Sequence, residues 1–266
     1  MNKMNMAGLS GFFLCLAAII FGIATNGGLK SIIDYLHLPS LILTLGGSFF
    51  AVLATSDSIR DCLDGVTGIL TAYKPPQTTT DDISGEILTM ADLARKSGLL
   101  SLEEYAGNSG NEFLAKGIRL IVDGSDPELV KDILENELVH KSDRTRKRIR
   151  FWEDLGSYAP AWGMIGTLLG LINMLKTMGA NPEAIGDGMS LALITTLYGS
   201  VIANWICIPV ARKIEKNSLA EELVMELTIE GVLSIQAGEN VRVIKEKIQA
   251  ILEHNVEEET DLAKAG

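Results

Sequence analysis

The sequence predicts an all-α, polytopic membrane protein with four transmembrane helices and a helical cytoplasmic region. The chain of 266 residues has a mean hydropathy of +0.23 although its net charge is −11, so its apolar residues must be segregated from its charges. Four stretches contain no Asp, Glu, Lys or Arg and are 26, 22, 21 and 24 residues long: 4–29, 35–56, 155–175 and 188–211. Because a helix needs about 20 apolar residues to cross a bilayer, each stretch is long enough for one span.

The composition also excludes several classes of protein. An acidic chain has no basic surface for nucleic acid. We find no nucleophile–base pair, no metal-ligand cluster and no nucleotide motif, so we expect no enzyme, no cofactor and no bound metal. Cys15, Cys62 and Cys207 lie in or next to apolar runs without disulfide or metal spacing, which predicts small hydrophobic side chains and not functional thiols.

The first apolar run is longer than the roughly 7–15 residues of a signal-peptide core, so we interpret it as a retained first span. After it, Leu29, Ile32, Ile33 and Leu36 recur at helical spacing, which predicts a short amphipathic helix on the outer surface. Pro39 then begins the second span, where its missing N–H has no cost.

The distribution of basic residues predicts the orientation. Residues 57–154 hold 13 of the 23 Lys and Arg residues, and the tail after Ala211 holds 7. Loops rich in Lys and Arg stay in the cytoplasm. We therefore expect both termini in the cytoplasm and the short connections 26–38 and 176–187 outside.

These patterns divide the chain into four parts. We expect the first two spans with the outer helix in residues 1–56 and a cytoplasmic helical domain in 57–153. The last two spans follow in 154–211, and a cytoplasmic helical tail in 212–266.

Within the cytoplasmic parts we expect helices throughout and no strand. One helix should continue from the second span to about Tyr73, and others should cover about 81–97 and 111–123. Gly98 is expected to cap the C-terminus of the helix at 81–97, and Ser101 with Glu104 is expected to form a capping box. Helix-breaking residues are absent from 128 to 155, and the tail is predicted to stay helical to about His254 before an acidic, disordered end at 257–261.

The spans, with the second beginning at Pro39, contain no Asp, Glu, Lys, Arg or His. A protein that carries ions alone usually keeps an ionisable group in the membrane, so either this chain moves no ions or a partner supplies that group. Hydroxyls are present, notably Thr167 in the third span and Thr196 in the fourth. They either bond back to their own helix or line a polar seam where an ion loses part of its hydration shell.

Other residues also have two interpretations. Pro160 and Pro209, in or near the last two spans, are tolerated kinks or hinges. Arg95 and Lys96 near a helix C-terminus, and Glu103 in a first turn, suit the helix dipole or form a docking face for another protein. The basic cluster before the third span favours anchoring at anionic lipid headgroups; it comprises Arg144, Arg146, Lys147, Arg148 and Arg150.

Four segments in this order resemble the MotA/PomA family of bacterial flagellar stator subunits, and the resemblance covers nearly the whole chain. They are PSLILTLGGS at 39–48, RKSGLLSLE at 95–103, APAWGMIGTLLGLI at 159–172 and ALITTLYG at 192–199. The resemblance implies a subunit that, with a MotB-type partner, conducts ions and converts the ion-motive force into torque. That partner contributes one transmembrane Asp and anchors to peptidoglycan, and five MotA-like subunits are thought to surround two partner helices.

The resemblance also implies roles for individual residues. Thr167 and Thr196 match the hydroxyls that face the ion path, and Pro160 and Pro209 match two prolines that couple ion passage to conformational change. Arg95 and Glu103, with Lys96 beside them, match the charged residues that meet the rotor protein FliG. One departure concerns residue 37, which is His37 where many relatives have an acidic residue, with Asp34 three residues earlier. The choice between H⁺, which we favour, and Na⁺ stays open at this point.

Two other functions compete with this interpretation. A TolQ/ExbB-type energiser of outer-membrane processes also depends on a transmembrane Asp of a partner protein, but those proteins usually have three spans. A passive membrane scaffold would contain the same hydroxyls only for structure. Substitution of Thr196 by Val separates a scaffold, which should tolerate it, from an ion path, which should not.

Overall fold

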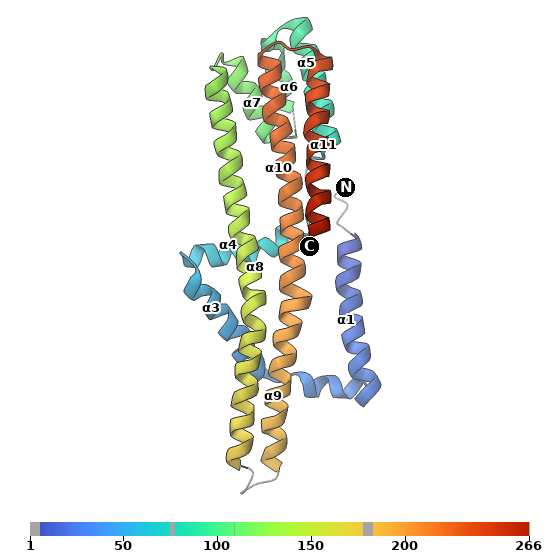
Figure 1. Cartoon of the computed structure of the whole chain (residues 1–266), viewed down its shortest axis with the longest axis vertical. Helices are drawn as coiled ribbons and strands as arrows, with labels where there is room; N and C mark the ends of the chain where they lie inside the picture. The colour runs from blue at the N-terminus through green and yellow to red at the C-terminus, as the bar shows by residue number, and fades with distance from the viewer. Residues whose placement is uncertain (1–5, 75–77, 109, 178–182, 266) are drawn as a thin grey trace. The chain divides into compact units, whose positions relative to one another are not determined.

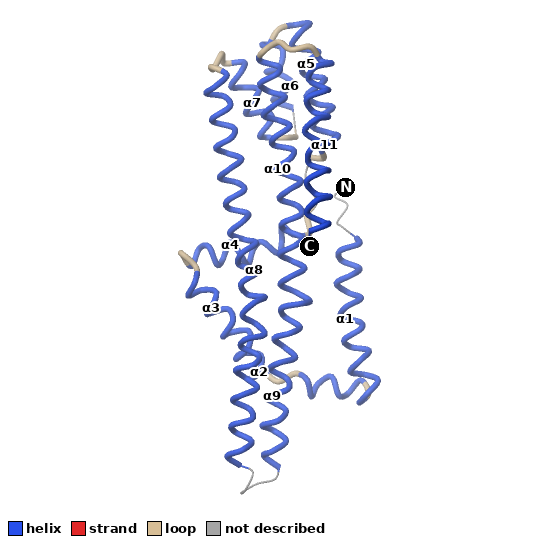
Figure 2. Tube along the Cα trace, viewed as in Figure 1, coloured by secondary structure: helices blue, strands red, loops and turns tan. Residues whose placement is uncertain are grey.

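A computed structural model describes residues 6–74, 78–108, 110–177 and 183–265. Every regular element in these residues is a helix, which confirms the predicted all-α fold (Figure 2). The elements are α1 (Met6–Gly27), η1 (Leu29–Tyr35), α2 (Leu38–Leu41), η2 (Ile42–Gly46), α3 (Gly47–Thr55), α4 (Ile59–Ala72), α5 (Thr80–Ser97), η3 (Leu99–Ser101), α6 (Leu102–Asn108), α7 (Glu112–Val122), α8 (Pro127–Thr177), α9 (Glu183–Val201), η4 (Ile202–Cys207), α10 (Ile208–Gln236) and α11 (Val241–Ala265) (Figure 1).

The chain forms two compact units. The first unit comprises Met1–Pro75 and Thr145–Lys216, and the second comprises Pro76–Arg144 and Asn217–Gly266. The apolar helices α1, α3 and α9 belong to the first unit, whereas α5, α6, α7 and α11 belong to the second. Each unit therefore has its own core, and each is described separately below.

Three helical stretches among the described residues are long and apolar enough to cross a membrane. They are Ile32–Thr55, Pro127–Lys176 and Ile185–Gln236, and they contain the predicted second, third and fourth spans. The segment Ser10–Thr25, in the predicted first span, is a shorter apolar helix. The apolar multi-pass character of the chain is thus evident, and the number of four spans remains a prediction.

Two of these stretches contain a π-helical segment that the sequence did not predict. In the helical run from Leu38 to Thr55 it is η2, and in the run from Glu183 to Gln236 it is η4. A π-helical turn accommodates an extra residue without ending the helix, and it changes the direction of the side chains that follow. Such turns are frequent at functional sites.

The predicted continuous helix from the second span to about Tyr73 is wrong, because the chain bends between α3 and α4 (Figure 1). Ser56 has an extended backbone, with φ −84° and ψ 144°. The Ser58 hydroxyl oxygen accepts a hydrogen bond from the Arg60 N–H at 3.2 Å, in the manner of an N-cap. The local preference of serine for capping therefore overrides the continuous apolar pattern.

Helix α4 packs against α8 in the core of the first unit. Arg148 donates two hydrogen bonds of 2.8 Å to the carboxylate of Asp64, and the Trp152 indole N–H donates to the Gly65 carbonyl at 3.0 Å. A Cβ at Gly65 would lie 2.4 Å from Cγ of Phe151, so only glycine permits this approach. Cys62 and Cys207 are buried in the same core, whereas Cys15 is exposed.

Two helix ends in the second unit follow the sequence closely. Helix α5 ends at Gly98, whose φ of +83° suits glycine, and the Asn111 side chain caps α7 by accepting from two backbone N–H groups. Ser101 ends the 3₁₀ turn η3 directly before α6, and its hydroxyl donates to the Gly98 carbonyl at 2.6 Å. The capping box of Ser101 with Glu104 stays a prediction.

The helical tail is divided by a turn that the sequence analysis did not predict. Gly238 has φ +69°, its N–H donates to the Ile235 carbonyl at 3.0 Å, and the Glu239 N–H donates to the Ser234 carbonyl at 3.1 Å. This is the Schellman pattern that ends a helix at glycine. Helix α11 then extends to Ala265, which corrects the predicted end near His254.

An ion-pair network joins α11 to α10 in the second unit. Lys247 Nζ lies 2.8 Å from Glu230 Oε1 and 2.9 Å from Glu239 Oε1. The hydrogen bond from Lys247 lowers the pKa of Glu239 below its ordinary value of 4.5. A carboxyl group with a lowered pKa stabilises the folded state above the pKa of the unfolded chain, and this contribution is lost as pH falls.

We therefore expect Lys247→Met to lower the thermal unfolding midpoint by about 1–3 °C at pH 7, because the pair is partly exposed. The difference from the unsubstituted chain should shrink below about pH 4.5, where the Glu239 carboxyl group becomes protonated. Circular dichroism melts at pH 7 and at acidic pH measure this. The control is Lys245→Met, since Lys245 is exposed and has no ion pair with a described residue. An equal difference at both pH values would contradict the prediction.

Candidate functional site

Helices α8 and α9 approach each other closely through a line of small residues. A Cβ at Gly163 would lie 2.9 Å from the Thr195 carbonyl oxygen, and one at Gly170 would lie 2.6 Å from the Gly188 carbonyl oxygen. From the other side, a Cβ at Gly199 would lie 2.5 Å from the Ala159 carbonyl oxygen. Small residues at membrane helix interfaces allow such backbone contact. The glycines of α8 and α9 therefore form a close helix interface.

The close approach brings together the two hydroxyls singled out from the sequence, Thr167 and Thr196, which we call the threonine pair. Their Oγ1 atoms are joined by a hydrogen bond. Thr167 Oγ1 is also 3.1 Å from the Gly163 carbonyl oxygen and 3.0 Å from that of Ala192, and Thr196 Oγ1 is 3.3 Å from the Ala192 carbonyl oxygen. Thus the hydroxyls bond within their helices and also across the interface.

The threonine pair presents more oxygen lone pairs than protons. Each hydroxyl has a single proton to donate and two lone pairs. Two carbonyl oxygens, those of Gly163 and Ala192, lie within hydrogen-bond distance of the pair. Thr196 is exposed in the isolated chain, and Thr167 is partly exposed. Hydroxyl and carbonyl oxygens of this kind can replace part of the hydration shell of a cation.

The second span contributes a row of buried hydroxyls that the sequence analysis missed. Ser40, Thr44 and Ser48 are fully buried. Thr44 Oγ1 donates to the Thr195 carbonyl at 3.5 Å, and Ser48 Oγ donates to the Thr44 carbonyl at 2.7 Å. Their spacing of four residues, which places them on one helix face, was the available signal. They bring polar groups from the second span up to α9.

The two prolines occupy different surroundings. Pro160 lies inside α8, and its Cα would be 3.0 Å from a Cβ at Gly199, so it is part of the close α8–α9 contact. Pro209 is exposed and comes two residues after the π-helical segment η4. A proline within a helix removes one backbone hydrogen bond. Pro160 therefore marks a weaker point in α8, which carries Thr167, and Pro209 marks one in the continuous helical run from Glu183 to Gln236, which carries Thr196.

The charged residues Arg95, Lys96 and Glu103, which we call the charged set, belong to the second unit and are exposed. Arg95 and Lys96 lie in the last turn of α5, and Glu103 lies in the first turn of α6, with Gly98 in the turn between them. Lys96 forms an ion pair of 2.5 Å with Asp92 one turn earlier. The structure thus keeps the charged set on adjoining helix ends, in a different unit from the threonine pair.

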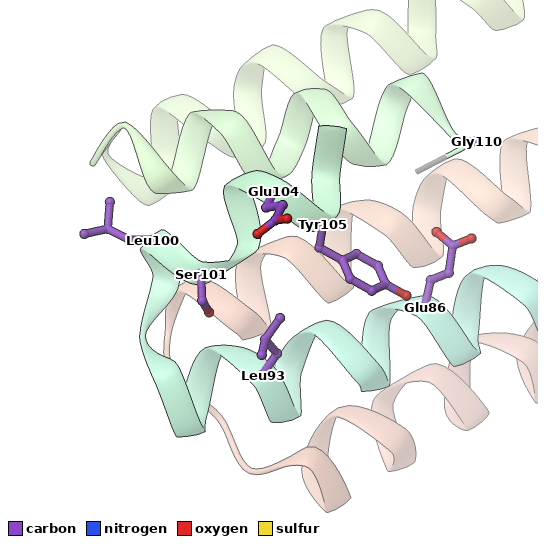
Figure 3. Close-up of a pocket in the computed structure, with 7 residues that line it drawn as sticks. All are labelled: Glu86, Leu93, Leu100, Ser101, Glu104, Tyr105 and Gly110. Atoms are coloured by element: carbon purple, nitrogen blue, oxygen red, sulfur yellow. The ribbon is translucent and has the colours of Figure 1, made fainter. Parts of the chain in front are cut away.

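A groove of about 740 Å³ adjoins the helix ends that carry the charged set (Figure 3). Leu100, which is 74% exposed, extends from the turn between α5 and α6. The groove is both apolar and acidic, and its described lining comprises Glu86, Leu93, Leu100, Ser101, Glu104, Tyr105 and Gly110. Among the described residues no cluster of His, Cys, Asp or Glu is arranged to hold a metal ion.

The chain is similar to known proteins along nearly its whole length. The sequence pattern of the MotA/TolQ/ExbB proton channel family matches residues 106–227. The chain is 35% identical to Motility protein A of Treponema phagedenis, over 94% of each protein. It is 37% identical to the chemotaxis protein PomA of Vibrio alginolyticus, over 91% of this chain and 92% of that protein.

Solved structures agree with these sequence relatives. The flagellar MotAB stator complex from Bacillus subtilis contains a chain with a TM-score of 0.79 and 28% identity, covering 92% of this chain and 94% of that one. A chain of C. jejuni MotAB has a TM-score of 0.84 at 23% identity, covering 93% of this chain and 96% of that one, and shows the same fold. The chain belongs to the MotA/TolQ/ExbB proton channel family.

Proposed function

We propose that this chain is a stator subunit of a bacterial flagellar motor, which forms an ion channel with a MotB-type partner. The observation that carries the proposal is the whole-length similarity to motility proteins and to a MotAB stator chain. A TolQ/ExbB-type energiser is less well supported. Motility protein A of two Treponema species and PomA of Vibrio alginolyticus, at 34–37% identity, are named as motility or chemotaxis proteins. The proposal assigns the chain no enzymatic activity.

The partner is proposed to supply the ionisable group that the spans lack. A transmembrane Asp of the partner, near the threonine pair, would be costly to bury while charged. Binding of an ion cancels this charge, and its release toward the cytoplasm restores it. Each such event changes which subunit best accommodates the carboxylate, so a ring of subunits would step around the anchored partner.

The threonine pair is proposed to face the ion path in this assembly. Its support is the shared hydrogen bonding of Thr167 and Thr196 and the exposure of Thr196, which leaves oxygen lone pairs accessible from outside the subunit. Pro160 and Pro209 are proposed to couple ion passage to movement of α8 and α10. Their support is the close contact around Pro160 and the π-helical segment just before Pro209.

The charged set is proposed to contact the rotor protein FliG. Arg95, Lys96 and Glu103 are exposed, so they are available to a protein partner. The spans also carry exposed apolar side chains, which supports contact with lipid and with other copies of the chain. They include Met164, Leu168, Leu175 and Leu193. We propose a ring, of five copies by resemblance, in the inner membrane with four spans and both termini in the cytoplasm.

Deletion of the gene tests the proposed function. We expect mutant cells to build filaments of normal number and length that do not rotate, as seen by electron microscopy and by tracking of tethered cells. Expression of the intact gene from a plasmid should restore rotation. Mutant cells that swim normally would contradict the proposal, and defects in outer-membrane integrity or uptake would then favour the energiser.

A further inference from the structure

Tyr198 joins the fourth span to the connection that precedes the second span. It lies on α9, and its hydroxyl donates a hydrogen bond to the Tyr35 carbonyl. The same hydroxyl oxygen accepts a hydrogen bond from the His37 N–H at 3.1 Å. One side chain therefore holds two backbone groups that are 163 and 161 residues away in sequence.

The two backbone groups that Tyr198 binds lie where regular structure is interrupted. Tyr35 ends the 3₁₀ helix η1, and His37 is the N-cap of α2. Carbonyls at the end of a helix and N–H groups at its beginning have no partner within the helix. A hydroxyl is suited to this position because it can donate to the first and accept from the second.

The N-terminus of α2 is fixed by a further set of hydrogen bonds. His37 Nδ1 lies 2.7 Å from the Ser40 hydroxyl and accepts from the Ser40 N–H at 3.3 Å. Ser40 is fully buried. His37 therefore serves as the N-cap of α2. The segment to which Tyr198 binds therefore has its local conformation fixed by hydrogen bonds of its own.

This attachment is close to the threonine pair. Tyr198 is three residues from Thr195 and shares its helix face, where the Thr195 carbonyl accepts from Thr44. Thr196 lies next to Thr195 and is exposed. The Tyr198 and Thr195 contacts attach the same face of α9 to the second span and its preceding turn. Together they determine the rotation of α9 about its axis, and hence the direction in which Thr196 presents its hydroxyl.

We propose that Tyr198 is a positioning residue of the ion pathway, which sets the orientation of Thr196 through its hydrogen bonds to residues 35 and 37. This inference rests on the proposed function, because it concerns how the threonine pair receives the ion. Tyr198 itself need not touch the ion. Loss of its hydroxyl should weaken ion binding more than it weakens the maximal rate of rotation.

Tyr198→Phe tests the inference, because it removes the hydroxyl and keeps the ring. Rotation speed is measured in the deletion strain across external pH and external Na⁺ concentration. We expect the ion concentration for half-maximal speed to rise about threefold to tenfold, because both hydrogen bonds of the hydroxyl are lost and part of this loss reaches Thr196, with little change in maximal speed. An unchanged half-maximal concentration, or a speed lowered in the same proportion at every concentration, would overturn the inference.

The matched control is Tyr158→Phe. Tyr158 is a half-buried tyrosine of α8 that packs against the core of the first unit, and its hydroxyl has no hydrogen bond to a described residue. We expect this variant to rotate flagella with the half-maximal ion concentration of the unsubstituted protein. A shift as large as that of Tyr198→Phe would overturn the inference, because the effect would then come from any tyrosine hydroxyl.

A second measurement does not depend on rotation. A spin label is placed at Leu36→Cys in the purified full chain in lipid, in a background with Cys15→Ala, since Leu36 is 74% exposed and the other two cysteines are buried. We expect Tyr198→Phe, but not Tyr158→Phe, to increase the mobility of the label. Equal mobility in all three proteins would overturn the inference. If the unsubstituted gene fails to restore rotation, the proposed function fails, while this measurement still decides the attachment.

Discussion

Thr196→Val is expected to reduce ion flux and swimming speed about tenfold to a hundredfold, because a hydroxyl that binds a charged group contributes about 1.5–3 kcal/mol. Valine has nearly the same shape as threonine. Since Thr196 is exposed, its replacement by valine creates neither a cavity nor a clash inside the subunit. The protein should therefore still accumulate in the membrane. Swimming is tracked in the deletion strain, and ion flux is measured in vesicles that contain the variant with its partner.

Two further variants distinguish an ion path from a scaffold. Thr196→Ser keeps the hydroxyl and should retain most of the swimming speed. Thr25→Val is the matched control, because Thr25 is an exposed threonine of α1 whose hydroxyl donates to the Gly22 carbonyl of its own helix at 3.0 Å. It should leave swimming unchanged. Normal swimming of Thr196→Val at normal abundance would favour a passive scaffold.

Gly199→Ala is expected to destabilise the first unit by about 1–3 kcal/mol, the usual cost of overpacking. The added Cβ would lie 2.5 Å from the Ala159 carbonyl oxygen and 3.0 Å from Pro160 Cα. Both are backbone atoms of α8, so the clash cannot be relieved by rotation of a flexible side chain. The helices must separate, which would also disturb the threonine pair. The expected results are a lower unfolding temperature in detergent and lower abundance in the membrane.

The comparison variant for this substitution is Gly11→Ala. Gly11 lies in α1, and a Cβ there would meet no atom within 4 Å. Alanine is the better helix former, so this variant should be at least as stable as the unsubstituted chain. If Gly199→Ala unfolds at the same temperature as Gly11→Ala, the α8–α9 contact is less close than the structure shows.

Much of the fold could be predicted from the sequence because helices depend on local patterns. Apolar run length indicated the membrane helices, and turn residues located most helix ends, including those at Gly98 and Asn111. The missed ends are also instructive. Ser56 and Ser58 interrupt an apolar pattern. Gly238 ends α10 through two backbone hydrogen bonds that involve few residues. Such short capping signals are easily hidden within a longer periodic segment.

The candidate site was predicted only in part. The family resemblance singled out Thr167 and Thr196, whereas their spacing in sequence left two interpretations open. Ser40, Thr44 and Ser48 were overlooked because isolated hydroxyls in an apolar helix are common and usually bond to their own backbone.

By itself, the sequence determined the helical class, the segregation of apolar and charged residues, and the absence of an ionisable group from the spans. These properties follow from residue type and periodicity, which are local. Only the tertiary structure decided that Thr167 and Thr196 meet across α8 and α9, and that Tyr198 holds residues 35 and 37. Contacts between residues far apart in sequence depend on helix rotation and on close packing at glycine, which no local pattern encodes.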